Sequence, residues 1–424
     1  MSVREIFLHH ALGVTPKALK TVVSNTHIQT TGENFMKKSL IAAALLGTFA
    51  ASAFAAPSVT LYGRIDTSLA YTHQRTSLSA TAGEVSVSGS NSTDTLSMES
   101  GFSTGNRWGL KGTEDIGNAK VGFVLESGFN SDDGASGQGG RLFGREAQVN
   151  VSGAYGTLYA GRIASIVSDG GSIGYLGNVS AFPNAFGFVG TQAGSTGSAY
   201  GRYDNTLAYQ TPVYSGLQAA AMYSFKADGK SKVGTENKAD ADRYAAAALR
   251  YKAGKAAVVL AGDYTLYSND TYGDLDNGYS VILGGNYDFG VAKVFAKATY
   301  FDDQASIKDS FSIIKNIRAS VAENVNLARA FKGWGAELST AVPAFGGTVL
   351  ATVGYRDAKD VDNSNVKLKR WNAAVGYSYA FSKRTSVYAA AGYAQEKATG
   401  SADGASATYK GSGAQAGFGL VHKF

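Results

Sequence analysis

From Ala56 onward, apolar and polar side chains alternate in segments of about ten residues, which are separated by turn-rich stretches. In Arg370–Phe381, odd positions carry mostly aromatic or aliphatic side chains such as Trp371 and Tyr377, and even positions are small or polar. Successive side chains of a strand point to opposite faces, so this period of two predicts β-strands with one apolar and one polar face. Sixteen such segments can be counted, centred on Tyr62, Gly109, Phe123, Gln148, Tyr159, Ala208, Met222, Ala247, Gly262, Leu283, Ala296, Glu337, Thr352, Val375, Ala390 and Gly419.

A soluble β-sandwich would use the same alternation to pack a core. Two features favour a transmembrane barrel instead. The second face is rich in Gly, Ser and charge, and aromatic side chains gather at strand ends, as at Tyr377, Tyr379 and Phe381. Short links also alternate with long ones, as periplasmic turns and external loops do. The long links are Thr72–Gly105, Ile163–Gly201, Asp228–Asp242 and Asp302–Lys332.

We therefore predict an all-β fold, a 16-stranded antiparallel transmembrane β-barrel around an aqueous lumen. Short turns would lie on the periplasmic side and long loops outside. Within the last long link, Ser312–Ala330 has much of the apolar spacing of a helix, which predicts a short surface helix.

The first 55 residues have the features of a leader. Met36–Lys38 is basic, an apolar stretch runs from Leu40 to Phe49, and small residues follow up to Ala55. This pattern predicts a secretory signal peptide, because its apolar core is shorter than the ~20 residues of a membrane helix. We assign residues 1–35 to a non-native or mis-assigned extension, 36–55 to the signal peptide and 56–424 to the barrel. The alternatives are a genuine long leader and a signal anchor that stays attached.

The composition of residues 56–424 argues against nucleic-acid-binding, catalytic, metal and cofactor sites. The chain has 39 Lys and Arg and 33 Asp and Glu, of which the leader holds 5 and 2, leaving 34 and 31 and a net charge of +3. This excess does not argue for nucleic-acid binding. There is no Cys, and His73 and His422 are the only His after the leader. We therefore expect no catalytic residues, no metal site and no cofactor.

Five stretches resemble the general porins of Gram-negative bacteria, in particular the betaproteobacterial type, and they run in order over essentially the whole chain after the leader. They are SVTLYG (58–63), RWGLKGTED (107–115), FVLESGF (123–129), FSKRT (381–385) and VHKF (421–424). The resemblance implies an outer-membrane channel for passive diffusion of small hydrophilic solutes and ions. It also implies a homotrimer and a third external loop folded into the pore.

The same resemblance implies two further partners, outer-membrane lipid and the barrel-assembly machinery that inserts such chains. Phe424, as the last residue, would be the signal that this machinery reads. The alternative is that Phe424 is one more lipid-facing aromatic side chain.

Charges at the constriction of a channel decide which ions pass, because a narrow lumen with low-dielectric walls focuses their field. Alternation places Arg64, Arg107 and Lys111 on the lumen face. The resemblance implies a ladder of wall arginines that faces acidic groups on the third loop. The residues that match this ladder are Arg107, Arg145 and Arg202, with Arg162 as a further candidate.

Arg145 is a difficulty, because it shares parity with Ala147, Val149 and Val151, which alternation places toward lipid. The opposite face, which begins with Glu146, would fit lipid even less well. One solution is a subunit contact, where outward polar residues are tolerated. For each arginine, the alternative to a constriction charge is a lumen charge elsewhere or a salt bridge at the rim.

The link that corresponds to the third external loop, Ile163–Gly201, carries one acid, Asp169, and no base. Its other residues include many Gly, Ser and aromatic residues, so the acidic groups expected from the resemblance are nearly absent. We therefore predict excess positive charge at the constriction and a preference for anions. Asp66, Glu114 and Glu126 are the wall residues that could add negative charge.

Three other functional classes are alternatives to a passive channel. A substrate-specific channel would show saturable conductance that its solute blocks. An outer-membrane enzyme would need a convergent catalytic set, which two histidines without a nucleophile motif do not provide. An adhesin or a soluble β-sandwich would dissolve without detergent.

Overall fold

The computed structural model describes residues 59–182, 186–187, 189–190, 201–269, 275–310, 330–402 and 404–424. Both the leader and the helix predicted at Ser312–Ala330 fall largely outside these ranges. The short helical turns within them are α4 (Gly137–Gly140), η2 (Leu176–Asn178) and η3 (Ala305–Ser310).

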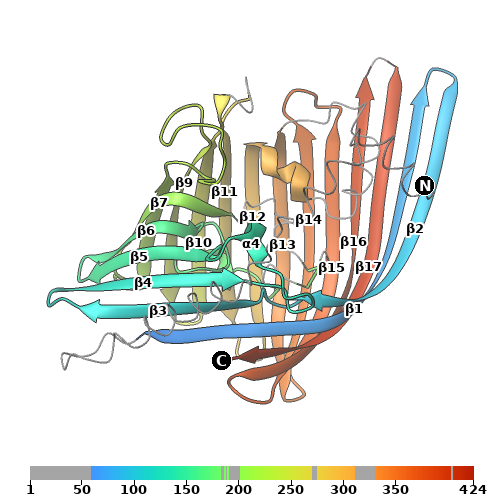
Figure 1. Ribbon diagram of the computed structural model, residues 1–424. Coiled ribbons are helices and arrows are strands. Elements are labelled where there is room, and N and C mark those ends of the chain that lie inside the picture. The colour runs from blue at the N-terminus through green and yellow to red at the C-terminus, as the bar shows by residue number, and fades with distance from the viewer. Residues whose placement is uncertain are drawn as a thin grey trace, which may run out of the picture. The chain divides into compact units, whose positions relative to one another are not determined.

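Nearly all of the regular structure is β-sheet (Figure 1). The strands are β1 (Thr60–Ala82), β2 (Val85–Ser100), β3 (Arg107–Asp115), β4 (Ala119–Gly128), β5 (Glu146–Gly153), β6 (Gly156–Ala164), β7 (Arg202–Gln210), β8 (Leu217–Ser224), β9 (Arg243–Ala253), β10 (Ala256–Leu266), β11 (Gly278–Asp288), β12 (Lys293–Gln304), β13 (Phe331–Ala344), β14 (Gly347–Asp360), β15 (Lys367–Ala380), β16 (Thr385–Ala402) and β17 (Ala405–Lys423).

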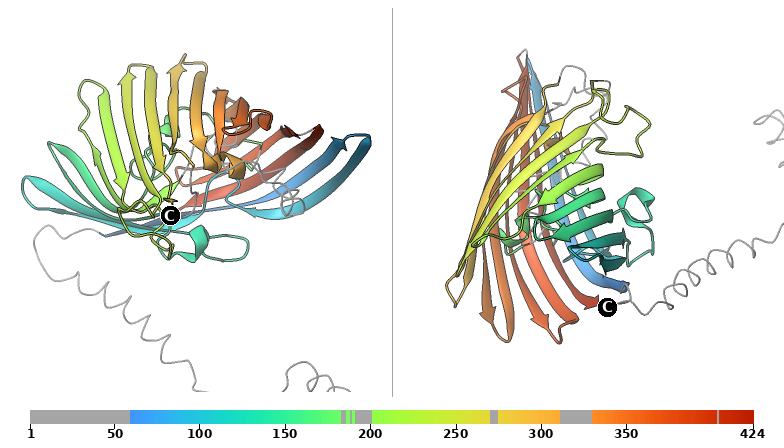
Figure 2. Two further views of the ribbon diagram at one scale, coloured as in Figure 1. Left: turned by 90° about the horizontal axis from the view of Figure 1, so that it is seen from above. Right: turned by 90° about the vertical axis from the view of Figure 1, so that its left-hand side faces the viewer.

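The sheet closes into a barrel of sixteen positions. Every pairing is antiparallel, and β1 pairs with β17 to close the ring. The second position is shared: residues 67–82 of β1 pair with β2, and residues 60–64 of β1 pair with β3, which continues to β4. Seen from above, the strands surround a central axis (Figure 2). The sixteen-stranded antiparallel barrel predicted from the sequence is confirmed.

Each of the sixteen predicted segment centres lies in a strand, but one long link was misread. Thr72–Gly105 is mostly not a loop, because β1 runs to Ala82 and β2 returns from Val85. Apolar side chains lie on the outer face of this hairpin only near Leu96 and Met98 and near the turn at Val85 and Val87, and Ser88–Thr95 between them is polar, so alternation did not reveal it. Its strands are held by backbone pairing with each other and, for β1, with β17.

Side chains alternate across the barrel wall as the period of two requires. In β15, Trp371 and Val375 are 39% and 59% exposed on the outer face, whereas Asn372 and Ala374 are buried on the inner face. The outer face is apolar because it must contact lipid, and backbone pairing within the closed sheet satisfies the polar main-chain groups.

The third loop (residues 165–201) packs inside the barrel over its described parts. Ile166, Ile173, Leu176 and Val179 form an apolar cluster with inward-facing residues of β7–β11, including Met222. The chain then passes along the wall to β13. There Ser180 donates a hydrogen bond to Glu337 of β13, and the Ala181 amide donates one to Ser339 Oγ at 2.9 Å.

Aromatic packing holds the far part of this loop. The ring centroid of Phe186 lies 5.2 Å from that of Phe182, 5.6 Å from that of Tyr388 on β16 and 5.9 Å from that of Phe102. Asn372 Nδ2 also donates to the carbonyl of Val189 at 2.7 Å. The loop therefore spans the lumen and is fixed to both walls.

The C-terminus completes the barrel against the first strand. Gly63 N donates to Phe424 O, and Phe424 N donates to Gly63 O, both at 3.0 Å. A Cβ at position 63 would overlap the Phe424 ring and lie 2.7 Å from the Arg107 carbonyl oxygen. Backbone cannot yield as a flexible side chain can, so this closure requires glycine.

We expect Gly63→Val to destabilise the barrel by about 1–3 kcal/mol, because the added methyl groups overpack the closure. The measurement is the unfolding temperature of protein refolded in detergent. Gly89→Val is the matched control, since a Cβ at Gly89 meets no atom within 4 Å. Equal unfolding temperatures for the two variants would show that the closure tolerates a side chain.

Candidate functional site

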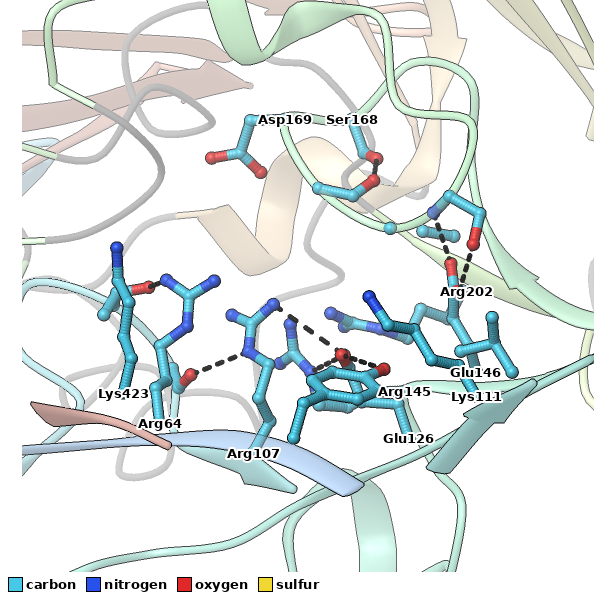
Figure 3. A pocket seen from close by; sticks show the side chains of 18 of the residues that line it. Arg64, Arg107, Lys111, Glu126, Arg145, Glu146, Ser168, Asp169, Arg202 and Lys423 are labelled. Atoms are coloured by element: carbon cyan, nitrogen blue, oxygen red, sulfur yellow. Dashed lines mark hydrogen bonds and ion pairs between the residues drawn. The ribbon is translucent and has the colours of Figure 1, made fainter. Parts of the chain in front are cut away.

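A cavity of about 850 Å³ lies inside the barrel between the wall and the start of the third loop (Figure 3). Strands β1, β3, β4 and β5 contribute one side, and β7, β16 and β17 contribute at their ends. Residues 168–172 of the third loop face this wall from across the cavity.

Basic side chains predominate around the cavity. Six basic residues line it, against three acidic ones. The basic residues are Arg64, Arg107, Lys111, Arg145, Arg202 and Lys423, and the acidic residues are Glu126, Glu146 and Asp169. In Figure 3 the basic side chains form a row along the wall, with Asp169 opposite.

Glu126 is held by three neighbours. Arg145 Nε donates to Glu126 Oε1 at 2.6 Å, and Arg107 Nη1 lies 3.7 Å from the same oxygen. The Tyr62 hydroxyl donates to Glu126 Oε2 at 3.0 Å. The charge of this carboxylate is therefore largely compensated locally. The Tyr62 ring also lies 5.1 Å below Lys111 Nζ, a favourable cation–π distance.

Glu146 fixes the third loop beside the cavity. Its carboxylate accepts from the Ser172 amide at 2.6 Å and from the Ser172 hydroxyl at 2.5 Å. Gly171 makes this approach possible: its φ is +78°, and a Cβ there would lie 2.6 Å from Glu146 Oε1. Both conditions require glycine.

A chain of buried hydroxyl groups positions the start of the same loop. The Tyr244 hydroxyl donates to Asp263 Oδ2 at 3.0 Å and lies 2.7 Å from Ser165 Oγ. Ser280 donates to the other oxygen of Asp263 at 2.5 Å. Ser165 in turn accepts the Val167 amide at 2.9 Å, which sets the turn that carries Asp169 to the cavity.

Most of the sequence-predicted site residues lie together. Arg64, Arg107, Lys111, Arg202 and Asp169 all line the cavity. The Arg64 guanidinium donates to Thr104 Oγ1 at 2.7 Å, which fixes its position on the wall.

Arg145 lines the cavity as well, and the difficulty with its parity has a structural cause. Strand β5 begins at Glu146, so Arg145 occupies a bend where alternation does not apply. Arg145 and Glu146 therefore both reach the cavity, whereas Val149 on the strand points outward and is 47% exposed. A subunit contact is not needed to explain Arg145.

Arg162 does not line the cavity. Its Nη1 pairs with Asp204 Oδ1 at 2.5 Å, and its Nε donates to the Gly144 carbonyl at 2.8 Å. Arg141 binds the other oxygen of Asp204 at 2.9 Å. Arg162 thus belongs to a salt-bridge network, which is the alternative that the sequence left open.

Sequence reasoning missed Glu146, Lys423 and Tyr62 as cavity residues. Alternation did place all three on the inner face, with Gln148, Val421 and Arg64 respectively. Alternation does not give the position of each residue along the barrel axis, because that position depends on strand tilt and on where the third loop packs.

The described ranges contain no helix of sufficient length and apolarity to cross a membrane. In the same ranges, no cluster of three His, Asp or Glu side chains is arranged to hold a metal ion.

A closed sheet with an apolar exterior and a charged, loop-narrowed interior defines a transmembrane β-barrel channel. Residues 42–399 match the family model described as Gram-negative porin. The chain belongs to this family, and it is an outer-membrane channel for passive diffusion of small hydrophilic solutes and ions.

Curated relatives agree with this assignment. The chain is 36% identical over 383 residues to an outer membrane porin protein of Bordetella pertussis, covering 85% of this chain and 94% of the relative. It is 30% identical over 358 residues to outer membrane porin protein 32 of Delftia acidovorans, covering 83% and 88%.

Solved structures share the fold. The anion-selective porin from Comamonas acidovorans is 24% identical with a TM-score of 0.54, over 87% of this chain and 100% of that one. The outer membrane channel DcaP of Acinetobacter baumannii is 14% identical with a TM-score of 0.54, over 87% and 97%.

We expect Tyr244→Phe to lower the free energy of unfolding by about 1–3 kcal/mol, because buried Asp263 loses a hydrogen-bond donor. Single-channel current should also fluctuate more, since Ser165 loses its partner at the base of the third loop. Thermal unfolding and planar-bilayer recording measure the two effects. Tyr251→Phe, at an outward-facing tyrosine of the same strand, is the control. Identical behaviour of the two variants would contradict the role assigned to this hydroxyl chain.

Proposed function

We propose that this porin prefers anions, and that the cavity described above is its constriction. The observation that carries the proposal is the excess of six basic over three acidic side chains around one cavity. In a narrow lumen these charges act at close range, and low-dielectric walls focus their field. The net charge of the whole chain then matters less than this cluster.

Two details strengthen the proposal. Glu126 is occupied by Arg145, Arg107 and Tyr62, so it offers little attraction to a passing cation. Among the described residues of the third loop, Asp169 is the one acidic residue that lines the cavity. Its neighbours there, Ser168, Gly170 and Ser172, are neutral. Arg64, Lys111, Arg202 and Lys423 therefore set the sign of the potential.

The likeness to the anion-selective porin from Comamonas acidovorans is consistent with this sign. We propose no enzymatic reaction, because family membership and the charged lumen already account for the site. A channel with a specific solute site remains the competing function, and conductance that saturates with solute concentration would favour it.

We expect purified protein in a planar bilayer to give a reversal potential of anion preference in a tenfold KCl gradient. Arg64→Gln combined with Arg202→Gln should lower the anion-to-cation permeability ratio on the order of twofold or more. Glu126→Gln should raise the ratio, because Arg107 and Arg145 lose their counter-charge.

Lys383→Gln is the control, since this exposed lysine lies in the turn between β15 and β16. Cation preference of the unaltered protein would overturn the proposal. Shifts of the same sign in the arginine and glutamate variants would overturn the assignment of these residues to the constriction.

We also propose a homotrimer of chains that begin at Ala56, exported through the signal peptide at 36–55 and inserted through the signal at Phe424. One structural relative is a trimer form of OmpT from Vibrio cholerae, 15% identical with a TM-score of 0.50. Residues 1–58 lie outside the described ranges, so the cleavage site rests on the sequence.

Native mass spectrometry of protein extracted from outer membranes tests these assignments together. The expected mass is that of three chains each lacking residues 1–55. Deletion of Phe424 should lower the amount in outer membranes but leave refolding in detergent possible. A monomer, or retention of the leader, would contradict the corresponding assignment.

A further inference from the structure

Six lysines lie on the outward face of β13–β17, near the external ends of these strands. They are Lys332, Lys359, Lys367, Lys369, Lys397 and Lys410. Their outward direction follows from alternation: Trp334, two residues from Lys332, is 49% exposed, and Trp371, two residues from Lys369, is also exposed. These lysines take no part in the cavity.

Strand register places the lysines directly opposite one another. Lys332 pairs with Lys359, and Lys359 pairs with Lys367. Lys369 pairs with Lys397, and Lys397 pairs with Lys410. Like charges directly opposite on one face of a sheet are destabilising. Anionic groups bound between these lysines would therefore relieve the repulsion along the row.

The strands themselves supply little negative charge on this face. Asp357 is the one outward-facing acid in β13–β17, and its carboxylate binds Lys369 Nζ at 2.7 Å. The other acids of these strands, Glu337, Asp360 and Glu396, are buried on the inner side. On β12, Asp302 and Asp303 lie beside Lys332 at the edge of the row. Lys359, Lys367, Lys397 and Lys410 are thus the core of an outward cationic patch.

An aromatic belt lies immediately on the membrane side of this patch. The rings of Trp334 and Tyr355 are 5.5 Å apart, and those of Trp371 and Tyr393 are 5.3 Å apart. Such belts mark the boundary between hydrocarbon and headgroups. Lys369 lies two residues beyond Trp371, a rise of about 7 Å along the strand. The lysines therefore stand at the level of lipid headgroups on the external side.

An apolar hollow of about 830 Å³ continues from the belt toward the membrane centre. Small side chains Ala373 and Ala391 form its floor, and Leu338, Val353, Val375 and Tyr393 border it. Tyr393 belongs to both the belt and the hollow. Charge, belt and hollow thus follow one another in the order of a lipid molecule: headgroup, interface and acyl chain.

We propose that this face of the barrel binds a phosphorylated lipid of the outer leaflet, with its phosphates between the paired lysines and an acyl chain in the hollow. A soluble anion would use the lysines alone, whereas the adjoining apolar hollow fits a lipid. The proposal is independent of ion selectivity, because these residues lie outside the lumen.

The test measures binding of purified lipid A to the full-length mature protein in zwitterionic detergent, by the fluorescence of Trp334 and Trp371 and by native mass spectrometry. The variant combines Lys367→Gln, Lys397→Gln and Lys410→Gln, which spares the Lys369–Asp357 ion pair. The control combines Lys120→Gln, Lys252→Gln and Lys255→Gln. These three exposed lysines lie on or beside β4, β9 and β10, at the short-turn end of the barrel. Unaltered single-channel conductance shows that each barrel is intact.

We expect the variant to bind lipid A at least tenfold more weakly, since it lacks three of the positive charges that attract the anionic headgroup. The control should bind as the unaltered protein does. Lipid A should also raise the unfolding temperature of the unaltered protein but not that of the variant, because the ligand relieves repulsion among the lysines.

Three results would overturn the proposal. The first is equal affinity of the variant and the unaltered protein for lipid A, which would show that the lysines do not bind it. The second is binding of inorganic pyrophosphate as tightly as lipid A, which would indicate a site for soluble anions. The third is binding of dephosphorylated lipid A as tightly as the intact form, which would indicate a purely apolar contact.

Discussion

Backbone hydrogen bonding in hydrocarbon is the constraint on which this structure depends. A strand that crosses lipid must pair on both edges, because an unpaired peptide group costs several kcal/mol there. The chain meets this condition by pairing β1 with β17 and by dividing the second position of the ring between β2 and β3. Closure ends at Gly63 and Phe424, where two backbone hydrogen bonds leave no space for a side chain.

A closed ring of sixteen strands is too wide for wall side chains to fill, so it leaves an aqueous lumen that only a separate element can narrow. The third loop is this element, and its apolar side chains pack against the inner wall as a small hydrophobic core. Ile166 and Leu176 pack on one wall, and Phe182 and Phe186 pack near the other. Its polar anchors, Glu146 and Glu337, are wall carboxylates that accept hydrogen bonds from loop serines. Acids in the lumen therefore hold the loop as well as adding charge.

The barrel could be predicted from the sequence because alternation of apolar and polar residues is a local property, which contact with lipid requires of each strand. Alternation also placed Arg64, Arg107 and Lys111 on the correct face, since parity needs only the strand. Alternation gave no guidance at two places. Arg145 lies in the bend before β5, and the apolar pattern of β2 is interrupted by the polar stretch Ser88–Thr95. Which charges share one cavity could not be predicted, because strand tilt and loop packing are set by contacts between distant residues.

The two groups of basic residues differ in chemistry as well as in position. Around the cavity they are mainly arginines, and fixed acceptors such as Glu126 and Thr104 hold their planar groups in one geometry. On the outer face they are all lysines, flexible point charges that adjust to a mobile partner. Inside, low-dielectric walls carry the field along the lumen, so a charge acts on an ion that it does not touch. Outside, salt screens charge within about 8–10 Å, so those lysines act only on a partner in contact with them.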